Sequence, residues 1–104
     1  MAGPDRIEFL YFADCPSHDE ALALLREVLA ARGITREVEV RELRSDEEAA
    51  ALAFPGSPTI RVDARDVDPA ADAAVPMLSC RVYWRDDGSV SPLPSRAQIE
   101  AALG

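Results

Sequence analysis

The sequence predicts one α/β domain: a two-layer sandwich in which helices cover a four-stranded mixed sheet, in the order β-α-β-α-β-β-α. Three segments lead to this prediction: an apolar run at Ile7 to Phe12, an amphipathic stretch at Ser17 to Arg32, and an alternating stretch at Thr35 to Leu43. A buried strand, a helix and a half-exposed strand in that order favour parallel strands joined by a right-handed crossover. A chain of 104 residues has room for one core, so residues 1–104 are assigned to a single domain.

The first three elements each follow from a local pattern. Ile7 to Phe12 is apolar on both faces except at Glu8, as in a strand at the centre of a sheet. In Ser17 to Arg32 the leucines recur at helical spacing, and Gly33 supplies a stop. Thr35 to Leu43 alternates valine with charged residues, which predicts an edge strand with one face in water.

The second half of the chain is expected to hold a short helix, two antiparallel strands and a terminal helix. Ser45 to Glu48 predicts a capping box that opens the short helix, and Thr59 to Val62 has the β-branched content of a strand. Asp63 to Met77 is longer than a hairpin needs, so we expect an excursion before a fourth strand at Ser79 to Trp84. A second capping box at Ser95 to Gln98 opens the last helix.

Charge and composition exclude several classes of function. The net charge of -8 repels phosphate backbones and anionic lipids, so we expect neither a nucleic-acid nor a membrane partner. Met1 to Arg6 lacks the features of a secretory signal, so we expect a cytoplasmic location. In a reducing compartment Cys15 and Cys80 are expected to be free thiols, and one histidine is too few to complete a zinc site. We therefore expect no metal and no cofactor.

Cys15 is the main candidate for a reactive group. It follows the first predicted strand and opens the first predicted helix, with Pro16 expected at the first helical position. Helix amides and the positive end of the helix dipole favour a thiolate there. His18 lies three residues on, where a redox dithiol would carry its second cysteine. Its imidazole either hydrogen-bonds the sulfur from the same helix face or lies in solvent.

The second motif is Ser57-Pro58-Thr59, a proline at the very start of a strand. X-Pro bonds are usually trans, but a thiol after the first strand together with a proline at this place resembles the thioredoxin superfamily, which carries a cis-proline there. The chain is also similar, over nearly its whole length, to the small thioredoxin-like DF family of (seleno)proteins. The motifs that carry this second resemblance are Leu10-Tyr11-Phe12 with Cys15-Pro16, Gly56-Ser57-Pro58-Thr59, Asp63-Ala64-Arg65-Asp66 and Cys80-Arg81-Val82-Tyr83.

The resemblance implies a thioredoxin-like sandwich in which Cys15 is the nucleophile. It also implies that Pro58 presents the backbone of Ser57 for strand-like pairing with a peptide or thiol substrate. Some related sequences carry selenocysteine, which implies redox or soft-metal chemistry. No cysteine stands at position 18, so the expected function is monothiol exchange with a protein disulfide or a low-molecular-weight thiol, resolved by an external thiol.

Cys80 is expected to be structural. If Ser79 to Trp84 runs antiparallel to Thr59 to Val62, Cys80 lies roughly 10 to 13 Å from Pro58, too far for a disulfide with Cys15.

Two other functions stay open. One is a non-catalytic binding module that uses the 63–77 excursion and an edge strand. The other is capture of a soft metal by Cys15 with Cys80 or His18. The sequence leaves open whether the chain is an enzyme, and whether it is a monomer or a homodimer.

Overall fold

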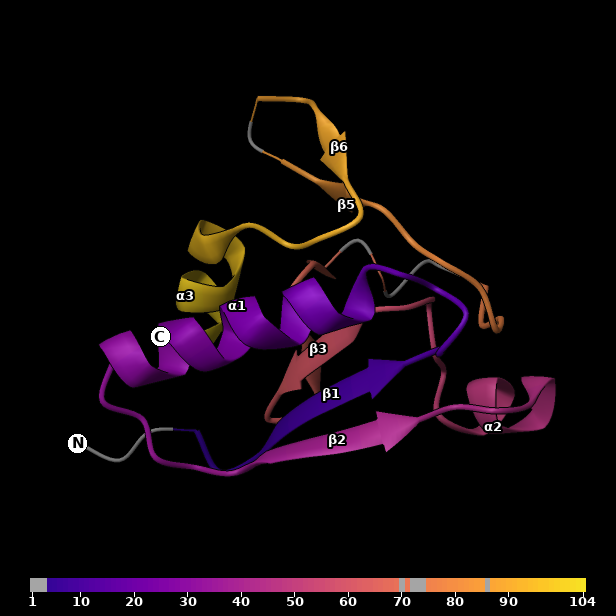
Figure 1. Cartoon of the computed structure of the whole chain (residues 1–104), viewed down its shortest axis with the longest axis horizontal. Coiled ribbons are helices and arrows are strands. Elements are labelled where there is room, and N and C mark those ends of the chain that lie inside the picture. The colour runs from indigo at the N-terminus through magenta and orange to yellow at the C-terminus, as the bar shows by residue number, and fades with distance from the viewer. Residues whose placement is uncertain (1–3, 70, 72–74, 86) are drawn as a thin grey trace.

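A four-stranded mixed sheet lies at the centre of the computed structural model, which describes residues 4–69, 71, 75–85 and 87–104. The strands occur in the order β2-β1-β3-β4 (Figure 1). Their bounds are β1 (Ile7–Tyr11), β2 (Val38–Glu42), β3 (Thr59–Val62) and β4 (Arg65–Asp66). β1 is parallel to β2 and antiparallel to β3, and β3 is antiparallel to β4. The predicted mixed α/β class with a four-stranded mixed sheet is confirmed.

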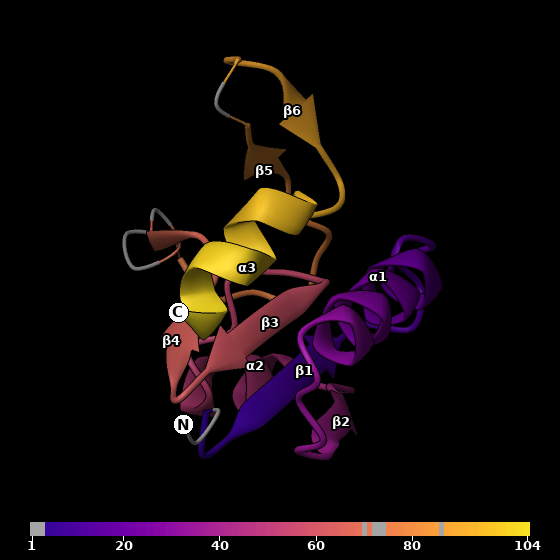
Figure 2. The same cartoon turned by 90° about the vertical axis from the view of Figure 1, so that its left-hand side faces the viewer.

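Two helices cover one face of this sheet. α1 (His18–Ala31) crosses from β1 to the parallel strand β2, and α3 (Arg96–Leu103) packs beside it, as Figure 2 shows. The core between these helices and the sheet contains Phe9, Leu25 and Ile99, all completely buried. The amphipathic pattern of the first helix and the apolar pattern of the first strand therefore predict this layer correctly.

A smaller cluster covers part of the opposite face. Leu10 points away from Phe9 because successive strand residues face opposite ways. It packs against Leu43, Phe54 and Ala49 of the short helix α2 (Asp46–Ala51). α2 lies beyond the carboxyl ends of β1 and β2 (Figure 1). The predicted two-layer sandwich does not include this second cluster, which lies on the sheet face opposite α1 and α3.

At α3 the predicted capping box is complete, whereas at α2 it is half formed, because the Glu48 carboxylate accepts from Arg44 N at 3.0 Å rather than from Ser45 N. The Ser45 side chain accepts a hydrogen bond from the Glu48 backbone at 3.1 Å. At α3 the box is complete, because Ser95 Oγ accepts from Gln98 N while Gln98 Oε1 accepts from Ser95 N. Each box satisfies backbone donors that a helix start leaves unpaired.

The prediction of a fourth strand at Ser79 to Trp84 is wrong. The fourth strand of the sheet is β4, which follows β3 after a two-residue turn at Asp63 and Ala64. Both turn residues have positive φ, 51° and 70°, as the tightest hairpin turns require. The Asp63 carboxylate also accepts hydrogen bonds from the backbone of Asp5 and Arg6, both at 2.9 Å, which holds the turn in place.

The end of the predicted fourth strand belongs to a separate hairpin. β5 (Tyr83–Trp84) pairs with β6 (Val90–Ser91), and the hairpin projects from the body of the fold (Figure 1). Part of the predicted 63–77 excursion, at positions 70 and 72–74, lies outside the described residues.

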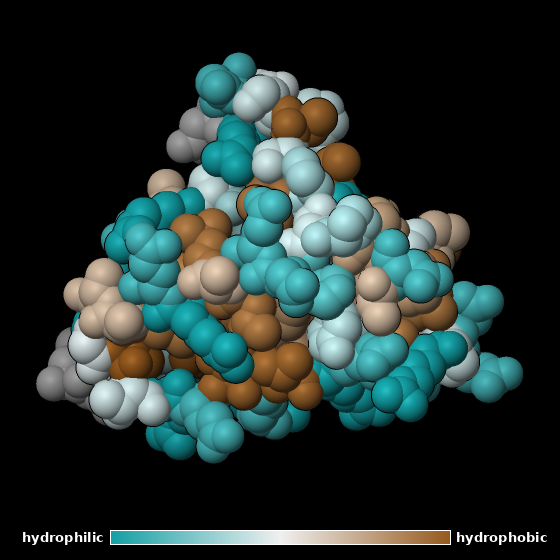
Figure 3. All heavy atoms as spheres, viewed as in Figure 1, coloured by the Kyte–Doolittle hydropathy of each residue, from teal (hydrophilic) through white to brown (hydrophobic). Residues whose placement is uncertain are grey.

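One face of the molecule carries both hydrophilic and hydrophobic side chains (Figure 3). Figure 3 shows hydrophilic residues over much of one face, with hydrophobic ones gathered mainly where α1 lies over the sheet. The described residues contain no helix that is both long and apolar enough to cross a bilayer. The 14 residues of α1 fall short of the roughly 20 that a span requires.

Candidate functional site

Cys15 lies in the loop between β1 and α1. Its backbone N–H donates to the Phe12 carbonyl at 3.0 Å, which folds the loop into a turn. α1 begins at His18 with Ser17 as its N-cap, so the prediction that Pro16 is the first helical residue is wrong. The reason is that the first helical hydrogen bond runs from Ala21 N to Ser17 O. Cys15 is therefore two residues before the N-cap, and the helix dipole acts on it less than expected.

The Cys15 thiol is buried and makes a polar contact with the proline motif. The residue is 1% exposed, and its Sγ donates to the carbonyl of Ser57 at 3.5 Å. Ser57 is completely buried, and its Oγ accepts a hydrogen bond from Phe12 N at 2.9 Å. Two hydrogen bonds therefore tie the thiol loop to Ser57.

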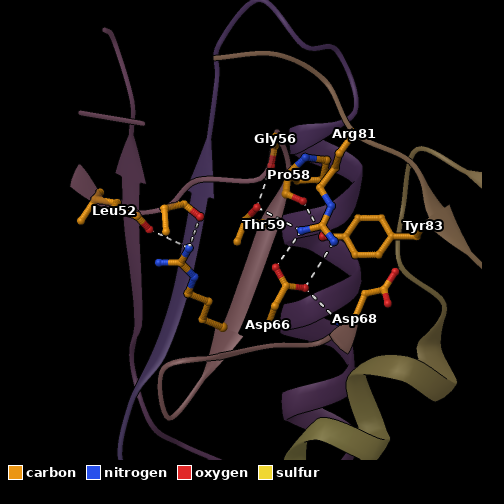
Figure 4. Close-up of polar contacts among 10 residues, drawn as sticks. Leu52, Gly56, Pro58, Thr59, Asp66, Asp68, Arg81 and Tyr83 are labelled. Carbon is orange, nitrogen blue, oxygen red and sulfur yellow. Dashed lines mark hydrogen bonds and ion pairs between the residues drawn. The ribbon is translucent and has the colours of Figure 1, made fainter. Parts of the chain in front are cut away.

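The proline motif adopts the backbone form that the resemblance implies. The Ser57–Pro58 peptide bond is cis. Thr59 Oγ1 donates to the Gly56 carbonyl at 2.6 Å, and the Tyr83 hydroxyl donates to the Pro58 carbonyl (Figure 4). Thr59 therefore supports the loop from within the fold.

The structure brings Cys80 to the site, so the expectation that it lies at the far end of the sheet is wrong. Ser57 N donates to Ser79 O at 2.7 Å, and Arg81 N donates to Ser57 O at 3.0 Å. These bonds form a parallel β-bridge between Ser57 and Cys80. The error arises because the fourth strand of the sheet is β4, which leaves Ser79 to Arg81 to pair beside the proline motif.

This bridge uses the backbone groups that the resemblance assigns to a substrate. Both the N–H and the carbonyl of Ser57 are bonded to the chain's own segment 79–81. Gly56 permits the close approach, since a Cβ built on it would lie 2.8 Å from Arg81 Cβ. Segment 79–81 thus takes the place expected for a substrate strand.

The two thiols interact with each other. Both cysteines are free; Cys15 is buried and Cys80 is exposed. A hydrogen bond with the Cys15 side chain, then burial, then the charge on Cys15 raise the pKa of Cys80 from 9.0 to about 11. Cys80 therefore keeps its proton at neutral pH, and both cysteines lie beside Ser57, Cys15 through its thiol and Cys80 through the β-bridge.

A buried ion pair anchors the segment that carries Cys80. Arg81 donates to Asp66 at 2.7 Å and to Thr59 Oγ1 at 3.2 Å, and the two charged side chains are only 7% and 6% exposed. The Arg81 guanidinium also lies 4.1 Å from the centroid of the Tyr83 ring (Figure 4). Burial raises the pKa of Tyr83, so its hydroxyl stays a donor.

Neither Arg81 nor Asp66 is predicted as a site residue from the local sequence pattern. Both occur in the motifs that carry the family resemblance, which is the one signal that marks them.

His18 is not brought to the sulfur. Its ring stacks on Tyr11 at 4.6 Å between centroids, and Nδ1 lies 3.2 Å from the Asp19 carboxylate. Within the described residues no hydrogen bond joins His18 to Cys15. The imidazole is neither free in solvent nor paired with the thiol.

A multidentate metal centre finds no support in the part of the chain that the structure describes. There, no three side chains of the cysteine, histidine, aspartate or glutamate type are grouped to hold a metal ion.

Comparison of the chain with protein-family models, with curated proteins and with solved structures finds no match in any of the three. The site must therefore be interpreted from its own chemistry.

Proposed function

We propose that this chain is a thioredoxin-like thiol–disulfide exchange protein whose redox pair is Cys15 and Cys80. The observation that carries the proposal is that both cysteines, from distant parts of the sequence, meet at Ser57: the Cys15 thiol donates to its carbonyl at 3.5 Å, and Cys80 is paired with it in a β-bridge. An internal second thiol replaces the external resolving thiol expected from the sequence. The substrate class is a disulfide of a small thiol or of a protein.

The thioredoxin-like part of the proposal rests on connectivity. A parallel pair β1 and β2 joined by α1, then an antiparallel strand β3 beginning next to a cis-proline, is the arrangement that the resemblance implies. The thiol loop and the proline loop meet at the same end of the sheet through the hydrogen bonds to Ser57. The position of the Cys15 thiol beside the proline loop supports a reactive role for Cys15 rather than a purely structural one.

Proximity explains how the pair would work. Once one sulfur forms a mixed disulfide, the other attacks it within the molecule, so its effective concentration is far above that of a free thiol. The chain loses two thiol protons and two electrons, and one external disulfide becomes two thiols. This exchange therefore needs no further oxidant or reductant.

The test is exchange with oxidised glutathione, using the reduced chain and its Cys15→Ala and Cys80→Ala variants. We expect wild type to release two equivalents of glutathione and to form an intramolecular disulfide, found by intact mass and peptide mapping. Each variant should stop at a glutathione adduct. Wild type that accumulates adducts on both cysteines without an internal disulfide would contradict the proposal.

The meeting of both cysteines at Ser57 also favours a second function, capture of a soft metal ion as cargo. Two thiolates suit a soft ion that accepts two sulfur ligands, such as mercuric ion. Titration should then show one tightly bound ion per chain, lost in Cys15→Ala and in Cys80→Ala alike. Equal tight binding by wild type and the Cys80→Ala variant would rule out a two-sulfur site.

A further inference from the structure

We infer that Cys80 is the sulfur that bonds to the external partner, and that Cys15 is the buried thiol that resolves the bond. This inference rests on the proposed function and assigns the two roles within it. It reverses the expectation from the sequence, in which Cys15 is the nucleophile.

Exposure is the first argument. Exchange requires an external sulfur to approach the attacked sulfur directly, so access decides which of two thiols meets a partner. Cys80 is exposed, whereas Cys15 is 1% exposed and its thiol is directed at the Ser57 carbonyl. A partner therefore reaches Cys80 first.

The second argument is that the Ser57 backbone, which the resemblance assigns to substrate pairing, is already bonded within the chain. Ser57 already bonds to Ser79 and Arg81 through its N–H and its carbonyl. A polypeptide partner cannot pair with Ser57 unless segment 79–81 leaves. The site as it stands suits a small thiol or disulfide, which needs access to one exposed sulfur and no strand pairing.

The chemistry balances in two steps. Cys80 first loses its proton to solvent, and the thiolate attacks an external disulfide RSSR, forming Cys80–S–S–R and releasing RS⁻, which takes up a proton from solvent as RSH. Cys15 then attacks the Cys80 sulfur, forming the Cys15–Cys80 disulfide and expelling the second RS⁻, which takes up the Cys15 proton. Two protein thiols are oxidised and one external disulfide is reduced to two RSH.

The reverse direction follows the same assignment. An external thiolate attacks the exposed Cys80 sulfur of the internal disulfide and expels Cys15. Access again favours attack at Cys80, because that residue is exposed whereas Cys15 is 1% exposed.

The experiment compares adduct formation in the two single variants. Reduced Cys15→Ala and Cys80→Ala proteins are mixed with oxidised glutathione at neutral pH, and the glutathione adduct is followed by intact mass. We expect Cys80 in the first variant to react faster than Cys15 in the second by about tenfold or more, because of access. In urea the two rates should converge, which separates burial from intrinsic reactivity. A faster reaction of Cys15 in the folded Cys80→Ala variant would overturn the assignment.

A second measurement uses wild type and does not depend on variants folding. The oxidised chain is treated briefly with reduced glutathione and quenched with acid, and the mixed disulfide is located by peptide mapping. We expect the glutathione on Cys80. Glutathione on Cys15 would overturn the inference while leaving the internal disulfide, and hence the proposed function, intact.

Discussion

The loop that carries Cys15 and the segment that carries Cys80 are held in different ways. The Cys15 loop is the direct continuation of β1, and hydrogen bonds of Phe12 and Cys15 to Ser57 hold it against the core. The Cys80 segment lies outside the four-stranded sheet and is fixed by one β-bridge and by the buried pair of Arg81 with Asp66. Cys15 is thus held by the core of the fold. Cys80 is held beside the fold by a few contacts that single substitutions can remove. Changes to those contacts should affect the pairing of the thiols more than the sheet.

The largest effect is expected from removing the anchor of the Cys80 segment. Asp66→Ala leaves the Arg81 guanidinium buried without its carboxylate, which should lower the free energy of unfolding by about 3 to 5 kcal/mol. Urea denaturation under reducing conditions measures this loss, and the internal disulfide should also form less readily.

Glu39→Gln is the matched control for Asp66→Ala. It removes the charge from an exposed pair, Arg6 with Glu39, in which both side chains are more than half exposed. Exposed pairs contribute little, so the denaturation midpoint should not move measurably. Equal losses in Asp66→Ala and Glu39→Gln would show that the buried pair is not the anchor.

A smaller effect is expected from forcing the bridge apart. Gly56 has φ 127°, and a Cβ there would meet Arg81 at 2.8 Å, so Gly56→Ala should destabilise the fold by about 1 to 3 kcal/mol. The Cys80 thiol should also move away from Cys15 and form the internal disulfide more slowly.

Gly88→Ala tests strain without the contact. Gly88 also has a positive φ, 85°, but a Cβ there would have no neighbour within 4 Å. Its substitution should destabilise the chain without changing the rate at which the internal disulfide forms. If both glycine variants slow disulfide formation alike, the close approach at Gly56 is not what positions Cys80.

The smallest effect concerns the titration of Cys80. Its pKa is raised, so the protonated form stabilises the fold below pH 9, and this contribution is lost as pH rises from 9 to about 11. Cys15→Ala removes the hydrogen bond and the charge beside Cys80, so the Cys80 pKa should fall toward 9.0. At neutral pH its alkylation by iodoacetamide should speed up by at most about 100-fold. An alkylation rate unchanged by this substitution would mean that the two thiols do not interact.

The Cys15 loop and the Cys80 segment also differ in how far the sequence predicts their positions. β1, α1 and β2 come from long periodic patterns, and the position of Cys15 follows from the end of an apolar strand. The Ser57-Pro58-Thr59 motif is recognisable because its residues are adjacent. These features are local, so the sequence carries them directly.

The position of Cys80 is not local. The strand β4 has two residues, too few for a periodic pattern, and its turn at Asp63 and Ala64 lacks the glycine or asparagine that marks such turns. Arg81 meets Asp66 across 15 positions of the chain, and Cys80 meets Ser57 across a longer interval. Without these long-range pairings the fourth strand is assigned to the wrong segment, and Cys80 is then placed at the wrong end of the sheet.

The most direct test of the proposed thiol pair is the equilibrium between Cys15, Cys80 and their disulfide in buffers of reduced and oxidised glutathione. We expect a single two-electron transition to a Cys15–Cys80 disulfide, with an effective concentration of the paired thiols in the millimolar range or above, roughly that of tethered groups. Two independent one-cysteine transitions, with glutathione on each sulfur and no internal disulfide, would contradict it.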